Sequence, residues 1–520
     1  MLEVFHAPSS SHNKEEKIAD KRYRRYGKEL KEILSALRDA EIEINEGVLR
    51  LEAGWLRWTT QLDSLKRMRH VMDEDHMQLF VELMHVLAGK LEMVTAMLRR
   101  VVRGLDRGPK PSDIRLIPRR LPYAFRKKSI DKAIEELEAW QKVSDPSWFL
   151  ILRMSDHRID SELATDSFAV STSIPSSVTI RDALNGVPKK RLALPPDELM
   201  KMSIANIHLC GSRLASRRAS TGVTRFILDR IECPASVDYQ VVKRDARDLA
   251  ARLQHDEPQN FGLLPCKGFL TEKVTENFET RILFTMVFKV PGEFSRVRSL
   301  RDYLLSTTTP NSLSNKFEMA RELARSIGYV HTFGFVHRNI RPETILTFDA
   351  IDRKIPATFL AGFESFRKEE GRTLRRGDDA WERNLYRHPS RQGLSLQHDY
   401  IMQHDIYSLG VCLLEVGLWQ SFVEHGQPGT QPRPSALLKT PKDASKQQLL
   451  THTQRNLQGV LLSLARDQLP RVMGSKYAEI VETCLTCLEP DNVDFGDQRE
   501  FEDEDGIRVG VRYIEKVSVT

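Results

Sequence analysis

The chain has 520 residues, of which 29% are charged, and a formal net charge of only +6. This length exceeds one typical hydrophobic core, so we expect two or three domains, and the balanced charge excludes a disordered acidic chain or a wholly basic nucleic-acid-binding one. No run approaches the roughly 18 apolar residues of a membrane-spanning helix, no signal peptide is present, and the six cysteines are typical of reduced core thiols, which predicts a cytoplasmic or nuclear protein.

Apolar residues recur at helical spacing through the first part of the chain. A first stripe runs from Lys21 to Met68, a second one follows the acidic start Asp73–Asp75, and a third helix is expected from Ser129, its N-cap. The second stripe consists of Phe80, Met84, Leu87, Leu91, Val94 and Leu98. Residues 1–154 are therefore predicted to form an all-α helical bundle.

A basic stretch covers residues 99–128 and is interrupted by four prolines, which predicts an extended loop. It could attract an anionic membrane surface or be a solvated connection, and we favour the connection because a charge run alone is weak support for binding. Its only aromatic residues, Tyr123 and Phe125, lie together at one end, so no nucleic acid partner is expected.

Composition changes after the bundle. Residues 155–200 are rich in Ser and Thr without sustained periodicity, which predicts a linker. Short β-like runs follow at 225–231, 261–265 and 281–290, and helical patterns dominate from Lys316. We expect an α+β domain over 201–490, with a small strand-rich lobe at about 201–305 and a large helical lobe at about 306–490, before an acidic tail at 491–520.

The most informative motif lies after an expected helix at 316–331. It reads His337-Arg338-Asn339-Ile340-Arg341-Pro342-Glu343-Thr344 and is similar to the protein-kinase catalytic loop His-Arg-Asp-Leu-Lys-Pro-Glu-Asn. The resemblance implies a bilobal protein-kinase-like domain. It also implies lost catalysis, because Asn339 replaces the aspartate base, Arg341 the lysine and Thr344 the metal-binding asparagine.

The metal-binding Asp-Phe-Gly of kinases is expected about twenty residues further on, where the chain has Gly362-Phe363-Glu364. Gly362 removes the carboxylate that would hold magnesium. A literal Asp494-Phe495-Gly496 lies too far from the loop to serve, and the acidic spacing around it does not fit an EF-hand. We therefore predict no metal site.

Two further residues match structural positions of the kinase family. Pro389, in Leu385-Tyr-Arg-His-Pro-Ser390, resembles the proline of the Ala-Pro-Glu that ends the activation segment, although the glutamate is missing. Asp405, in Asp405-Ile-Tyr-Ser-Leu-Gly410, resembles the helix aspartate that orients the catalytic-loop backbone.

The small lobe leaves two alternatives for the phosphate-binding lysine, and no Gly-x-Gly-x-x-Gly precedes them. Lys243, in Tyr239-Gln-Val-Val-Lys243, is the candidate cofactor-binding residue, but an exposed helix lysine is the simpler interpretation because 245–253 is helical in pattern. The better strand, Phe226-Ile-Leu-Asp229, would put Asp229 at that position instead.

The segments 129–141, 145–153 and 494–516 resemble parts of filamentous-fungal HeLo-like, prion-inhibition and propagation proteins, several of which carry kinase-like domains. The resemblance implies a role in non-self recognition (heterokaryon incompatibility) or regulated cell death, with the bundle as effector and self-association domain. Residues 1–25 are polar, unlike a membrane-inserting helix, so either the bundle is truncated at its N-terminus or membrane attack is not its role.

We therefore expect a catalytically inactive pseudokinase that acts as a signalling protein or scaffold, cytoplasmic or peripheral at membranes. ATP is the one cofactor compatible with the motifs, without efficient magnesium-dependent catalysis. One alternative is an atypical active kinase in which Glu364, Asp349 or Asp352 supplies a displaced carboxylate. The other is a structural adaptor that binds no nucleotide.

Overall fold

The computed structural model describes residues 192–496 with short gaps, and parts of two helical stretches within 17–32 and 81–99. The gaps after residue 192 are 221, 234–238, 255–257, 277–278, 307–311, 351–355, 364–365, 369–378, 394–399, 427–429, 441–443 and 493. The chain divides into two compact units, Met1–Pro175 and Ser176–Thr520. The division falls within the predicted linker, and each unit is described by itself.

In the first unit, the described residues of both stretches are helical and the stretches contact each other. Arg22 Nη2 lies 2.9 Å from Glu92 Oε2, and Arg99 pairs with Glu29. Tyr26 and Leu91 are buried. Leu91 belongs to the predicted second stripe. The other residues of that stripe, the expected helix from Ser129 and the basic stretch beyond Arg99 lie outside the described residues.

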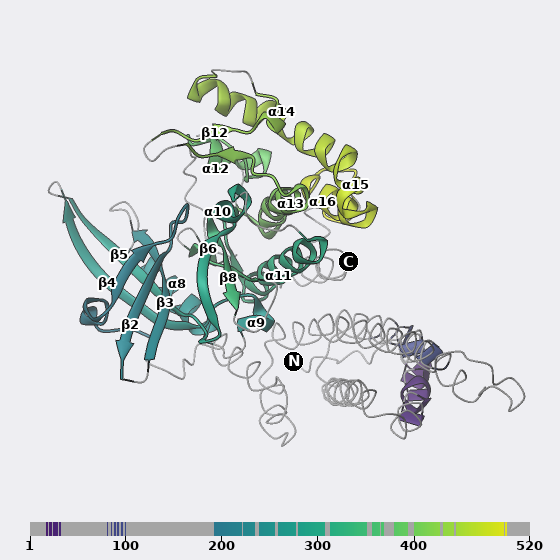
Figure 1. Cartoon of the computed structure of the whole chain (residues 1–520), viewed down its shortest axis with the longest axis horizontal. Coiled ribbons are helices and arrows are strands. Elements are labelled where there is room, and N and C mark those ends of the chain that lie inside the picture. Colours follow the sequence, from purple (N-terminus) through teal and green to yellow (C-terminus); the bar gives the residue numbers. More distant parts are fainter. Residues whose placement is uncertain are drawn as a thin grey trace, which may run out of the picture. The chain divides into compact units, whose positions relative to one another are not determined.

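The second unit begins with an antiparallel five-stranded sheet, whose strand order is β1-β2-β3-β5-β4 (Figure 1). A 3-10 helix, η3, precedes the sheet, and α8 packs against β4 and β5. The elements are η3 (Pro196–Lys201), β1 (Ser203–Asn206), β2 (Arg213–Ala219), β3 (Gly222–Cys233), α8 (Tyr239–Arg252), α9 (Pro258–Phe261), β4 (Cys266–Glu276) and β5 (Glu279–Lys289).

The end of the predicted linker pairs with an edge strand of this sheet. Leu194 N donates to Phe269 O at 2.9 Å and Phe269 N to Leu192 O at 2.9 Å, which adds residues 192–194 in parallel to the edge strand β4. Close approach requires Gly268, because a Cβ there would lie 2.2 Å from Leu192 O. Residues 192–200 therefore belong to the sheet half of the unit.

A helical half follows, built around a three-stranded sheet of order β6-β8-β9 (Figure 1). Its first elements are β6 (Phe294–Ser299), α10 (Leu300–Leu305), α11 (Leu313–Thr332), β7 (Phe335–Val336), η4 (Pro342–Thr344), β8 (Ile345–Ala350), β9 (Ala357–Leu360) and β10 (Arg367–Lys368). The later ones are α12 (Trp381–Asn384), η6 (Pro389–Arg391), α13 (Met402–Leu418), β11 (Val423–Glu424), β12 (Arg433–Pro434), η7 (Ala436–Leu438), α14 (Lys446–Asp467), α15 (Leu469–Met473) and α16 (Ser475–Leu485).

Most of the expected elements of this unit are present. The predicted helix at 316–331 is α11, where the Ser312 hydroxyl caps the N-terminus by accepting from Asn315 N. The predicted strand at 281–290 corresponds to β5, which ends one residue earlier at Lys289. The expected strand at 261–265 is wrong, because only Leu263 pairs, in a single bridge to Leu360. Gly262 turns the chain there with φ of +62°, and a Cβ on it would meet Ser326 Oγ.

A buried arginine joins distant parts of the helical half. Arg301 of α10 is fully buried, with Nη1 2.6 Å from Glu415 Oε1 and Nε 3.0 Å from Glu343 Oε1. Arg301 also donates to Tyr386 Oη, whose hydroxyl donates to Glu415 Oε2 at 2.8 Å. One side chain therefore connects α10, the 337–344 loop, the 385–390 segment and α13.

We expect Arg301→Met to destabilise the protein by about 3–5 kcal/mol, because it leaves Glu343 and Glu415 buried without their cation. Urea unfolding at neutral pH measures the change. The matched control is Arg466→Met, which breaks the exposed Arg466–Glu482 pair and should cost less than about 1 kcal/mol. Equal losses in the two variants would contradict this prediction.

Candidate functional site

The site is built on the loop 337–344, whose backbone is held by one buried carboxylate. Asp405, at the start of α13, accepts from His337 N at 2.7 Å and from Arg338 N at 2.9 Å. His331 and Tyr400 also donate to it. Burial would raise the pKa of Asp405, but the hydrogen bonds from His331 and Tyr400 and the nearby histidines hold that pKa below its usual value. The loop is thus fixed with Arg338 at a positive φ of 65°.

The side chains at positions 339, 341 and 344 bind one another and the Gly362 carbonyl. Asn339 Nδ2 donates to Gly362 O at 3.2 Å, and Asn339 Oδ1 accepts from Arg341 Nε at 2.9 Å. The Thr344 hydroxyl donates to Asn339 O at 2.7 Å. An amide cannot act as a base near neutral pH, and this one is engaged at both its oxygen and its nitrogen. The arrangement closes the loop on itself.

Gly362 and Thr344 fit together in a way that excludes a side chain at position 362. Gly362 has φ of +77°, and a Cβ on it would lie 2.4 Å from Thr344 Cγ2 and 2.7 Å from Thr344 Cβ. An aspartate therefore needs both a strained backbone and a smaller or displaced neighbour. Glu364, the third residue of the predicted degenerate metal motif, lies outside the described residues.

Asp229 connects the sheet to the segment Gly362-Phe363. It lies on β3, is 2% exposed, and accepts from Gly362 N at 2.8 Å and Phe363 N at 3.3 Å. The Ser212 hydroxyl donates to its other oxygen. The buried charge is thus satisfied by donors from the two halves of the unit.

Lys243 does not take part in this contact. It lies on α8, where its side chain is exposed and its ammonium stands 5.5 Å from the centroid of the Tyr239 ring. The segment that contains it is helical from Tyr239 to Arg252, so the similarity to a strand motif is wrong. Asp229, the alternative left open by the sequence, is the residue on the strand.

The turn between β1 and β2 contacts both Asp229, through Ser212, and α10. The Ser299 hydroxyl donates to His208 O at 2.9 Å, and His208 Nδ1 lies 2.9 Å from Asp302 Oδ1, so the turn is tied to α10. Ser212 ends the turn and is buried. Burial raises the pKa of the neighbouring Cys210 thiol to about 12, which keeps it protonated and unreactive.

The space between the sheet and the loop is filled by apolar and aromatic side chains. The Phe363 ring lies 5.8 Å from Phe288 and 4.8 Å from His337, centroid to centroid, and all three are buried. Ile227, two residues before Asp229 and paired with Phe288, is fully buried. Burial lowers the pKa of His337 to about 4, so it is neutral and donates from Nε2 to Ala361 O.

The remaining candidates are structural in their contacts. Pro389 starts η6, and His388 before it lies with Nε2 3.0 Å from Cys487 O. In the literal Asp494-Phe495-Gly496, Phe495 is fully buried and its carbonyl accepts from Leu488 N at 2.9 Å. A Cβ on Gly496 would lie 2.2 Å from Asn492 O, so these residues form a tight turn. Within the described residues, no group of three or more potential metal ligands is assembled.

Ser212, Arg301 and Glu415 were not anticipated. Glu415 carries a usable signal, because it is the only charge in the apolar run Leu409–Leu418 and a charge there must be buried with a partner. Ser212 and Arg301 carry no comparable local signal. In comparisons with known proteins, no family model matches the chain and no curated protein does.

We expect stability to fall on acidification because His337 is held neutral. Its folded pKa of about 4 lies below the ordinary 6.5, so the unfolded chain binds the proton first and stability falls as the pH drops from about 6.5 towards 4. Between pH 7 and pH 5 the loss from this residue is about 2 kcal/mol.

Urea titrations at pH 7 and pH 5 test this, with His337→Gln expected to lose less stability than wild type over the same interval. The matched control is His452→Gln, because His452 is a half-buried histidine on α14 outside the site. This control should keep the pH dependence of the wild type. An unchanged pH dependence in His337→Gln would argue against a neutral buried imidazole.

We expect Asp229→Leu to destabilise the second unit by about 3 kcal/mol, because the amides of Gly362 and Phe363 and the Ser212 hydroxyl lose their acceptor. Asp229→Asn retains one oxygen and should lose less. Chemical denaturation measures both. If Leu and Asn are equally tolerated, the carboxylate does not hold the two halves together.

Proposed function

We propose that the second unit is a protein-kinase-like domain without catalytic activity, in a chain that acts as a pseudokinase signalling or scaffold protein. The first unit, for which a HeLo-like bundle is proposed, would serve assembly or effector action in fungal non-self recognition or regulated cell death. The assignment rests on the residues that resemble both families. The order of elements supports it, because a five-stranded sheet with α8 packed against it is followed by a helical half.

The arrangement of the three matching segments also supports a kinase-like domain. The 337–344 loop, Gly362-Phe363 and Asp405 lie far apart in sequence, yet hydrogen bonds connect all three. In kinases the loop and the Asp-Phe-Gly segment form the catalytic centre, and a helix aspartate orients the loop backbone. Here they hold an amide, a glycine and a backbone-binding carboxylate.

Asp229 is the observation that carries the proposal of inactivity. In kinases, a lysine on the third strand binds the nucleotide phosphates. Here the third strand of the sheet presents a buried carboxylate, which is occupied by the amides of Gly362 and Phe363. A carboxylate repels phosphates at short range in a desolvated site, so the site disfavours nucleotide binding as well as phosphoryl transfer.

The atypical active kinase receives little support from these contacts. Its displaced carboxylate would have to come from Asp349, Asp352 or Glu364. Asp349 lies on β8 with an exposed side chain, 3.8 Å from Arg298 Nη2, and the other two lie outside the described residues. The packed aromatic interior favours the alternative in which the domain responds to no nucleotide and works as an adaptor.

The proposed partners are proteins, including further copies of the chain through the first unit, and an anionic membrane surface through 99–128. We propose a cytoplasmic location, peripheral at membranes where that stretch engages lipid. Among the helices that the structure describes, none has the length and apolar character to cross a bilayer.

We expect ATP at about 1 mM, with or without magnesium, to leave the melting temperature of the full chain unchanged, because a ligand stabilises only the fold that binds it. The double variant Asn339→Asp/Gly362→Asp should remain inactive in phosphoryl transfer, since Asp229 still faces the site and Thr344 blocks the new side chain. Thermal shift and labelled-phosphate transfer are the measurements.

A melting temperature that rises with ATP would support a nucleotide-responsive switch over an adaptor. Magnesium-dependent transfer by the wild type that Asn339→Ala abolishes would overturn the proposal of inactivity. Transfer that persists in Asn339→Ala would point to a contaminating kinase.

A further inference from the structure

Residues 192–202, here called the strap, bind one face of the five-stranded sheet. The strap begins with the parallel pairing of 192–194 to β4 and continues through η3 to Met202, directly before β1. It is the last part of the chain before the sheet, so it connects the sheet to everything that precedes it.

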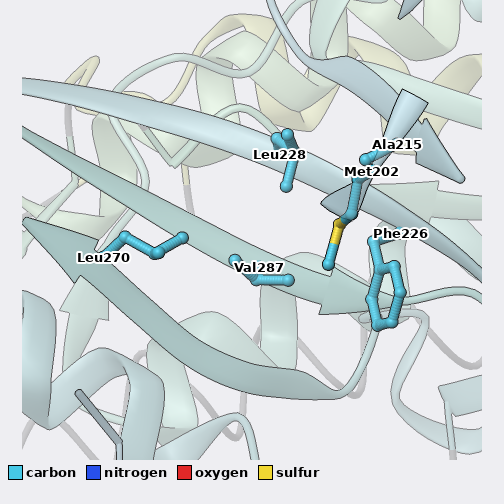
Figure 2. Close-up of a cluster of buried hydrophobic side chains, with 6 residues drawn as sticks. All are labelled: Met202, Ala215, Phe226, Leu228, Leu270 and Val287. Carbon is cyan, nitrogen blue, oxygen red and sulfur yellow. The ribbon is translucent and has the colours of Figure 1, made fainter. Parts of the chain in front are cut away.

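Apolar packing around Met202 holds the strap on the sheet. The ion pairs of Glu198, here called the clamp, lie beside that packing. Met202 is buried in a cluster with Leu194 and Leu199 packed against it, and Figure 2 shows Met202 close to the residues of β2–β5 in that cluster. The cluster residues of the sheet are Ala215, Phe226, Leu228, Leu270 and Val287. Such contacts lose favourable transfer free energy when they separate.

Glu198 provides the clamp. Its Oε1 accepts from Lys267 Nζ at 2.5 Å and from Arg217 Nη1 at 2.9 Å. The hydrogen bond from Lys267 outweighs partial burial and lowers the pKa of Glu198, which therefore stays charged at neutral pH. Both cations also lie over the Phe226 ring, within 5.9 Å of its centroid.

Strand β3 lies between the strap and the contact of Asp229 with the Gly362 and Phe363 amides, which is here called the closed site. Successive side chains of a strand point to opposite faces. Phe226 and Leu228 belong to the cluster under the strap, whereas Ile227 and Asp229 face the other way, where Asp229 reaches Gly362 and Phe363. A shift of β3 that follows a loss of packing on the strap side must therefore also move Asp229 on the opposite face.

We propose that the strap is a conformational device that couples the linker to the closed site: while seated, it holds β3 where Asp229 binds the Gly362 and Phe363 amides. Lifting the strap removes one half of the packing on β3 and loosens the Asp229 contact. A partner or a force acting on the linker reaches Leu192–Leu194 first. The coupling is reciprocal, so opening the site also loosens the strap. It does not depend on the proposed pseudokinase function.

Hydrogen–deuterium exchange on the full chain tests the coupling, using Met202→Ser against Met200→Ser. Met200 lies on the same strap but is 88% exposed, whereas Met202 is 9% exposed. We expect Met202→Ser to speed exchange in peptides spanning Gly362 and Phe363 by about tenfold or more, because local opening sets amide exchange. Peptides from α16 should exchange as in wild type, and Met200→Ser should match wild type throughout.

Glu198→Gln is a second variant that removes the charge of the clamp without creating a cavity. We expect it to speed amide exchange at Gly362 and Phe363 as well, but by less than Met202→Ser does. If Met202→Ser fails to fold, Glu198→Gln decides the question. Faster exchange confined to the strap, β2 and β4, with the Gly362 and Phe363 peptides as in wild type, would overturn the proposal. So would acceleration of equal size in Met200→Ser.

Discussion

The hydrogen bonds from the Gly362 and Phe363 amides to the Asp229 carboxylate are the contact on which the arrangement of the second unit depends. A buried carboxylate is tolerated only when donors surround it, and here the donors come from the sheet half, through Ser212, and from the helical half. The two halves are thus joined by a charge that neither could bury alone. The same charge makes the region between them unfavourable for another anion.

The residues Asn339, Thr344 and Gly362 are physically coupled. Thr344 occupies the space that a side chain at position 362 would need, and it also binds the Asn339 carbonyl. Asn339 in turn binds Gly362 O. These residues form a self-consistent polar and steric set, in which each member is explained by the others. A substitution at one position meets the contacts of the remaining ones, so the three residues stabilise the loop as a set.

Local pattern was sufficient for α11, whose apolar residues recur at helical spacing, and for β5, which is a strand-like run of aromatic and β-branched residues. The helix α13 was expected only from the resemblance of the segment at Asp405 to a kinase helix, because α13 is buried on all sides and shows no periodicity. Local pattern was insufficient at Lys243 and Asp229, where the five residues Tyr239–Lys243 and the four residues Phe226–Asp229 look alike and only the continuation of the helix to Arg252 separates them. The Arg301 cluster could not be found in this way, since its partners lie 42, 85 and 114 residues away. The short run at 261–265 misled because its apolar residues pack around a glycine turn.

The turn at Asp494-Phe495-Gly496 has a practical consequence for where an expressed fragment can be cut. Phe495 fills the core beside Cys487, and Asn492 holds the turn by accepting from the amides of Asp494 and Phe495. An expressed fragment cut at residue 490, where the acidic tail was expected to begin, would therefore open a cavity next to α16 and expose apolar surface to self-association. A fragment that ends after Gly496 retains the buried Phe495 side chain. The choice of endpoint will therefore decide whether the unit is soluble when produced alone.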